Sequence, residues 1–125
     1  MKLRHLIVLA GVALSASPAA AHPKLLSAAP AAAATATPTG RVRLVFDERL
    51  MPQRSTAVLV MTGMPGMANH PDMKMPGVAT ALSRDRRTVV LSSARPLPAG
   101  TYRVDWAVAG ADGHRVSGRH AFSIR

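Results

Sequence analysis

The run of residues most informative about the architecture is Pro98-Ala99-Gly100-Thr101-Tyr102-Arg103-Val104-Asp105-Trp106-Ala107-Val108. A Pro-Ala-Gly turn opens it, and apolar side chains then alternate with polar ones. The residues that share the apolar face are Tyr102, Val104, Trp106 and Val108. Alternation of this kind is typical of a strand with one buried face. Because Tyr102 follows the turn directly, it resembles a tyrosine corner, a feature of β-sandwiches. The run therefore predicts a strand over residues 101–108 in an all-β domain.

Shorter runs of the same kind occur elsewhere in the chain and are bounded by Pro, Gly or polar turns. The expected strands cover residues 41–46, 57–61, 78–82, 88–91 and 119–124, with an N-terminal piece at 22–27. Loops or extended connections are expected at residues 28–40, 61–75, 83–86 and 110–118. About seven short strands and no helix longer than one turn predict a seven-stranded, immunoglobulin-like Greek-key β-barrel or sandwich. Residues 22–125 would form this single domain.

The first 21 residues have the composition of an export signal rather than of a folded element. Lys2 and Arg4 form a basic start, and Leu6–Leu14 is apolar but too short to span a bilayer. Small residues at 19–21 provide a cleavage site, so His22 would become the first residue of an exported, periplasmic domain. No segment after the signal is apolar enough to predict a transmembrane helix.

The chain is strongly basic, with a formal net charge of +10, or +8 once Lys2 and Arg4 are removed. Nucleic-acid binding is disfavoured, because the arginines are dispersed, only one Trp, one Tyr and two Phe are present, and the product is exported. Such a charge suits anionic lipid or an acidic protein surface. The chain has no cysteine. In an oxidising compartment thiols would be drawn into disulfides, so methionine is the better soft ligand there.

A methionine-rich segment covers residues 61–75, Met61-Thr62-Gly63-Met64-Pro65-Gly66-Met67-Ala68-Asn69-His70-Pro71-Asp72-Met73-Lys74-Met75. It holds five of the seven methionines and is broken by Pro and Gly, so it predicts a loop rather than a helix or a central strand. Thioethers are soft, uncharged ligands that select Cu(I). The methionines of this segment, with His70 among them, therefore predict a Cu(I) site in the loop.

A second set of metal-ligating residues depends on cleavage after Ala21. The free α-amine and the imidazole of His22 could then chelate one metal, which suits Cu(II) if another imidazole and an oxygen complete the set. Asp112 and His114, separated by one glycine in the loop after residue 108, offer both groups. The predicted Cu(II) ligands are therefore His22, Asp112 and His114. Because the amine must lose a proton to bind, affinity should fall as the pH drops.

Several stretches occur in the order found in one known family. They are Ala21-His22-Pro23-Lys24-Leu25, Phe46-Asp47-Glu48, Met61 to Met67 with His70 and Met73, Pro98 to Trp106, and Asp112-Gly113-His114. Through them the chain resembles the periplasmic copper-resistance and copper-binding proteins of the CopC/PcoC family over residues 22–125. The resemblance implies a Greek-key β-barrel or sandwich with two copper sites at opposite ends. It implies His22, Asp112 and His114 as the Cu(II) ligands and Met61, Met64, Met67, His70 and Met73 as the Cu(I) ligands.

Four side chains allow two interpretations each. Glu48 either orients a ligand imidazole from the second shell or is a strand-end charge. Met75 is either an extra ligand or a cover for the loop, since methionine is also a common packing residue. His70 could be a solvated loop residue, yet its place between two methionines favours a ligand. His120 is in phase with Phe122 and Ile124, which favours a buried histidine over a ligand.

The sequence predicts a periplasmic copper carrier or buffer for copper resistance or homeostasis rather than an enzyme. It would pass copper to a CopD-like inner-membrane transporter or to another periplasmic copper protein. The alternative is a copper-brace oxidative enzyme, because an N-terminal histidine and a second histidine resemble the ligands of lytic polysaccharide mono-oxygenases. The chain is short for that role, and its single Trp and Tyr are expected in the core. A metal-free, adhesion-like sandwich would leave the methionine-rich loop unexplained.

Overall fold

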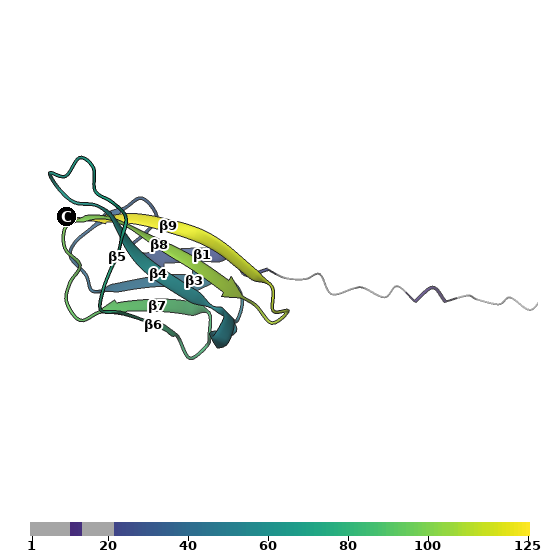
Figure 1. Cartoon of the computed structure of the whole chain (residues 1–125). Coiled ribbons are helices and arrows are strands. Elements are labelled where there is room, and N and C mark those ends of the chain that lie inside the picture. Colours follow the sequence, from purple (N-terminus) through teal and green to yellow (C-terminus); the bar gives the residue numbers. More distant parts are fainter. Residues whose placement is uncertain (1–10, 14–21) are drawn as a thin grey trace, which may run out of the picture.

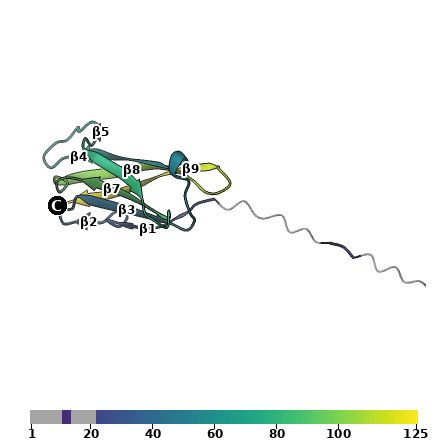
Figure 2. The ribbon, with the colours of Figure 1, turned by 90° about the horizontal axis from the view of Figure 1, so that it is seen from below.

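Two β-sheets make up residues 22–125 in the computed structural model, which describes residues 11–13 and 22–125 (Figure 1, Figure 2). The elements are β1 (Leu25–Ala29), β2 (Thr35–Ala36), β3 (Arg41–Phe46), the 3-10 turn η1 (Pro52–Arg54), β4 (Thr56–Gly63), β5 (Met73–Lys74), β6 (Val78–Leu82), β7 (Thr88–Ser93), β8 (Gly100–Ala109) and β9 (Arg115–Ile124). Residues 11–13 have no regular secondary structure, and the rest of the predicted export signal, 1–10 and 14–21, lies outside the described residues.

One sheet has the strand order β1-β3-β7-β6 and the other the order β2-β9-β8-β4-β5. Neighbours are antiparallel except β2 and β9, which run parallel. The connections from β3 to β4 and from β7 to β8 both cross from the first sheet to the second, where β4 and β8 pair antiparallel. The predicted all-β sandwich is confirmed. Among the described residues nine strands stand where seven were predicted, because the two-residue pairings at β2 and β5 count as strands.

Most strands follow the alternation of apolar residues in the sequence. In β3, Val42, Leu44 and Phe46 are at most 1% exposed, as the alternation predicts. Strand β6 has the predicted bounds, and the predicted polar turn before β7 is closed by a 2.9 Å hydrogen bond from the Arg86 N–H to the Ser83 carbonyl. Within the predicted connection at residues 28–40 lie the end of β1 and all of β2.

The last strand departs from the prediction, because β9 begins at Arg115 and not at residue 119. The β8–β9 hairpin continues through the pairs Val108–Val116 and Ala107–Ser117, so the predicted loop over 110–118 is only residues 110–114. Gly118 suggested a loop in the sequence. In the structure it is an interior strand residue whose missing side chain leaves room for an aromatic ring of β8.

The core lies between the sheets and is centred on β8. Tyr102 is 1% exposed, and its hydroxyl donates a 2.5 Å hydrogen bond to the Pro98 carbonyl, which confirms the predicted tyrosine corner. Its ring stacks on Phe122 with the centroids 5.6 Å apart and the planes 14° apart. The remaining core residues are Val42, Leu44, Phe46, Leu50, Ala57, Leu59, Met61, Val89, Leu91, Leu97, Val104, Val108 and Ile124. All of them lie within residues 22–125, so the domain contains its own core.

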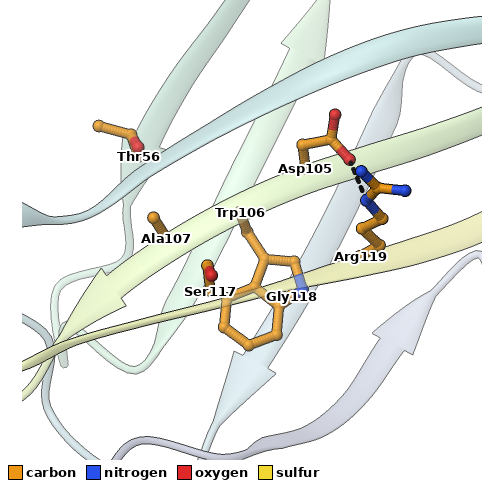
Figure 3. A pocket seen from close by; sticks show the side chains of 7 residues that line it. All are labelled: Thr56, Asp105, Trp106, Ala107, Ser117, Gly118 and Arg119. Carbon is orange, nitrogen blue, oxygen red and sulfur yellow. Dashed lines mark ion pairs between the residues drawn. The ribbon is translucent and has the colours of Figure 1, made fainter.

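Trp106 packs against this core from β8, as its place in the alternation predicts. Its ring meets Phe46 edge to face, with centroids 5.1 Å apart and an interplanar angle of 76°. Figure 3 shows the indole beside Gly118 on β9, its cross-strand partner. A Cβ on Gly118 would overlap the six-membered ring and would lie 2.7 Å from Cε2 and 2.9 Å from Cη2. The glycine is therefore required by the position of the tryptophan.

We expect Gly118→Ala to destabilise the domain by about 1–3 kcal/mol, because neither the rigid indole nor the strand backbone can move aside without disturbing Phe46. Urea unfolding of residues 22–125 measures the effect. Ser117→Ala, at the adjacent exposed position of β9, is the matched control and should change stability little. Equal stability of the two variants would contradict the packing described.

Candidate metal-binding sites

The methionine-rich loop joins β4 to β6 and lies at the end of the sandwich that also holds the C-terminus (Figure 1). Three of its thioethers face solvent: Met64 is 42% exposed, Met67 53% and Met73 45%. Met64 and Met67 share a turn in which the Met67 N–H donates to the Met64 carbonyl over 3.2 Å. Large apolar side chains this exposed are unusual as a group, so packing does not explain them.

The other members of the predicted Cu(I) set are less exposed. Met61 is 2% exposed and belongs to the core, and it is paired across β4 and β5 with Met73. Directly paired residues of antiparallel strands project to the same face. His70 is half-buried, and its Nδ1 is buried without a hydrogen-bond partner. Met75 is half-buried and packs against the core, where it covers the base of the loop. The ligand roles of these residues remain predictions.

A charged network on the outer face of the sheet anchors this loop. Arg103 of β8 donates from Nε and Nη2 to both carboxylate oxygens of Asp105, over 2.7 and 3.0 Å, and from Nη1 to Asp72 over 3.0 Å. Arg119 of β9 lies 3.6 Å from Asp105, an ion pair drawn in Figure 3. These carboxylates raise the pKa of Arg103, so the guanidinium stays charged. Arg103 therefore ties the segment between His70 and Met73 to the sheet.

This anchor was not found from the sequence. Arg103 and Asp105 lie two residues apart on the predicted strand, which places them on one face and makes their contact foreseeable. Nothing in the sequence pairs Asp72 with them, because its position depends on the path of the loop.

Asp72→Asn should loosen the loop while leaving the sheets intact, because the amide loses the charge-assisted bond to Arg103. Hydrogen–deuterium exchange of the backbone measures this, with faster exchange expected over residues 63–73 only. Arg119→Gln serves as the control, since Arg119 touches the same network but not Asp72. Unchanged exchange in Asp72→Asn would show that the loop is held in another way.

The second predicted ligand set lies at the opposite end of the sandwich, where the loop between β8 and β9 meets the N-terminal residues (Figure 1). The rings of His22 and His114 are 5.7 Å apart between centroids and meet edge to face at 78°. Asp112 accepts hydrogen bonds from the His114 backbone N–H over 3.0 Å and pairs with its Nδ1 at 3.2 Å. The backbone bond, the side-chain bond and the nearby His22 hold the pKa of Asp112 below its usual range.

Several contacts hold the N-terminal segment against this loop. Asp47 accepts a 2.8 Å hydrogen bond from the Lys24 N–H, and its own N–H donates to the Lys24 carbonyl over 3.0 Å. Pro23 is buried against Gly110, and Glu48 Oε2 lies 2.7 Å from the position that a Cβ on Gly110 would take. Glu48 is thus next to the segment that carries His22. Asp47 was not among the predicted site residues, although it fixes that segment directly.

The structure brings His22, Asp112 and His114 close to one another, but their side chains do not form a complete metal-ligand set. Among residues 11–13 and 22–125, no three His, Asp or Glu side chains are arranged to hold one metal ion. The predicted set counts the α-amine of His22 as a ligand, and that amine exists only after cleavage. In the structure, Nδ1 of His114 contacts the carboxylate of Asp112. His120 lies apart from both sets. It is 5% exposed, with Nε2 2.8 Å from the Pro30 carbonyl, in keeping with the predicted buried position.

The sequence matches the CopC domain over residues 25–125, which is most of its length. The chain belongs to the CopC family. Among CopC relatives, copper resistance protein C of Pseudomonas syringae pv. tomato is 42% identical over 118 residues, covering 93% of this chain and 90% of that protein. Copper resistance protein C of Escherichia coli is 39% identical over 115 residues, covering 92% and 88%.

Solved structures agree with this assignment. The crystal structure of PcoC, described as a methionine-rich copper resistance protein from Escherichia coli, matches with a TM-score of 0.76 and 36% identity, covering 84% of this chain and 100% of that chain. Murine CRIg, at 13% identity and a TM-score of 0.51, shares the fold alone, in line with the predicted immunoglobulin-like class. The described residues form no helix with the length and hydrophobicity that crossing a bilayer requires.

Proposed function

We propose that this CopC-family chain is a periplasmic copper-binding protein that carries or buffers copper in copper resistance or homeostasis. The observation that carries the proposal is the exposure of three thioethers, Met64, Met67 and Met73, in one loop. Thioethers in that position bury little apolar surface, whereas they are suitable soft ligands for Cu(I). The copper resistance proteins related to this chain support the same role.

In this proposal the methionine-rich loop takes Cu(I) through Met61, Met64, Met67, His70 and Met73, with Met75 as a spare ligand. The orphaned Nδ1 of His70 supports a ligand role, because a buried ring nitrogen without a partner is costly unless something binds it. Thioethers carry no proton, so they can hold the ion in acidic surroundings. Exposed, neutral ligands also allow the ion to leave by exchanging one ligand at a time.

The opposite end takes Cu(II) once residues 1–21 have been removed. The α-amine and imidazole of His22, the imidazole of His114 and the carboxylate of Asp112 would supply nitrogen and oxygen ligands. The 5.7 Å separation of the two rings supports this, because a small rotation of His114 away from Asp112 would direct both imidazoles to one ion. Glu48, beside the same segment, would orient one of these imidazoles.

The two ends differ in ligand softness, so each suits one oxidation state of the cargo. Reduction of the ion favours the thioether end, and oxidation favours the nitrogen and oxygen end. The recipient in this proposal is a CopD-like inner-membrane transporter or another periplasmic copper protein.

The alternative, a copper-brace oxidative enzyme, also starts from His22 and His114. Such an enzyme needs an exposed aromatic platform for a polysaccharide. The only Trp and Tyr of the chain pack on Phe46 and Phe122 at the core. We therefore propose carriage rather than catalysis.

Replacing Met64 and Met67 together by Ala should weaken Cu(I) binding by about tenfold or more and leave Cu(II) binding unchanged. Competition titrations of residues 22–125 with a Cu(I) chelator measure the affinity. Met51→Ala, a methionine outside the loop, is the matched control and should bind as the parent does. Full Cu(I) affinity in the double variant would refute the assignment of the loop.

One extra residue ahead of His22 should abolish tight Cu(II) binding, because the α-amine moves away from the imidazole and the chelate is lost. Parallel Cu(II) and Cu(I) titrations of the extended and unextended proteins test this. Cu(I) affinity should not change, since the methionine-rich loop lies at the other end. Retention of Cu(II) affinity by the extended protein would remove the amine from the site.

A further inference from the structure

A hollow at the His22 end of the molecule has exposed arginines in its lining and in the segments beside it, and we call four of them the arginine rim. Arg49 and Arg86 line the hollow, Arg84 belongs to the same turn as Arg86, and Arg54 follows the lining residue Pro52 in η1. The hollow has a volume of about 350 Å³ and is lined by Arg49, Leu50, Met51, Pro52, Arg86 and Ala111, among others. Ala111 belongs to the loop that carries Asp112 and His114, so the hollow adjoins the proposed Cu(II) site. Arg54 lies near Gly113 of the same loop.

Among the described residues, no arginine of the rim forms an ion pair. The ion pairs among the described residues join Arg103, Arg119 and His114 to carboxylates, and none includes an arginine of the rim. Asp85 accepts from the Ser83 hydroxyl and the Arg87 N–H, and Asp47 accepts from the Lys24 N–H. Asp47, Glu48, Asp85 and Asp112 keep their negative charges at this end of the molecule, but none of them forms an ion pair with an arginine of the rim, so these guanidinium groups can pair with an external anion.

The backbone conformation of Arg86 is unusual for an arginine. Its φ of 58° lies in the left-handed region, which is uncommon for a residue other than glycine. Its backbone closes the turn, with its N–H bonded to the Ser83 carbonyl over 2.9 Å and its carbonyl accepting from the Leu50 N–H over 2.8 Å. Glycine would serve this backbone with less strain. The backbone of the turn therefore does not require an arginine, and the side chain of Arg86 lines the hollow.

We propose that the arginine rim is a docking surface for an acidic segment of a partner protein. Planar guanidinium groups bind carboxylates through paired hydrogen bonds, and arginine is enriched at protein interfaces. Leu50, Met51 and Pro52 line the same hollow, so the fitting segment carries an apolar residue between its acidic ones. Opposite charge also steers such a partner toward the loop with Asp112 and His114. The docking itself needs no metal. Only the role of the neighbouring loop as a Cu(II) site rests on the proposed copper function.

The test uses residues 22–125 without copper, so its outcome is separate from that of the copper titrations. The probe is a synthetic peptide of five glutamates, one leucine and five glutamates, titrated by NMR at low ionic strength. Saturable binding is expected, with shifts over residues 49–54, 84–86 and 111. Arg49→Gln with Arg86→Gly should weaken binding by about tenfold. The matched control, Arg41→Gln with Arg43→Gln, removes the same charge from the exposed positions of β3 and should change affinity by less than about twofold.

Arg86→Gly alone keeps the test independent of folding, because it should leave the melting temperature equal or higher while weakening the peptide complex. No saturable binding, equal losses in the two double variants, or a lowered melting temperature for Arg86→Gly would overturn the proposal. A parallel titration uses vesicles containing phosphatidylglycerol. If the rim variant lost vesicle binding but kept peptide binding, the surface would be a lipid site and the proposal would be wrong.

Discussion

The hydrogen-bonded pairing of β8 with β4 on one edge and β9 on the other sets the position of both proposed metal sites. Near its start, Tyr102 pairs with Met61, where β4 enters the methionine-rich loop, and near its end Ala109 pairs with Arg115, where the loop with Asp112 and His114 closes. At about 3.3 Å per residue, the ten residues of β8 separate these ends by about 30 Å. Ligands at the two ends therefore cannot share one ion within a molecule, and each site is expected to fill independently of the other.

Both ends follow one arrangement, in which most of the proposed ligands stay exposed and the residues that flank them are fixed, while Met61 and His70 are the less exposed members of the Cu(I) set. At the methionine end, Asp72 is held by Arg103, while Met64 and Met67 remain in solvent. At the other end, Asp47 accepts a hydrogen bond from the Lys24 N–H and Pro23 packs against Gly110, while His22 and His114 remain exposed. A rigid sheet thus positions each loop without enclosing it. Such an arrangement suits the release of a cargo better than its permanent retention.

The sequence predicted the sheets well, because alternation directly reports which face of a strand is buried, as Val42, Leu44 and Phe46 illustrate. It misplaced the start of β9, because Gly118 has two physical explanations, a flexible loop or space for Trp106, and only the packed structure distinguishes them. The burial of Met61 agrees with its place at the end of an apolar run in the sequence. The approach of His22 to His114 could not come from periodicity, since it joins residues from distant parts of the chain, and the family resemblance supplied it. The contact between Arg103 and Asp72 depends on the course of a loop, for which the sequence carries no comparable signal.

The segment from β5 to β6 has a consequence beyond metal binding. It runs along the outer edge of β4, where Lys74 and Met73 pair with Val60 and Met61, the Met75 N–H donates to the Leu59 carbonyl over 2.9 Å, and the Thr80 hydroxyl donates to the Ala57 carbonyl over 3.3 Å. An uncovered edge strand is a template onto which a second chain can add. The segment that follows the methionine-rich loop therefore occupies backbone groups of β4 with which a second chain would otherwise pair. A change in the loop that displaced this segment would expose the edge of β4 to such pairing.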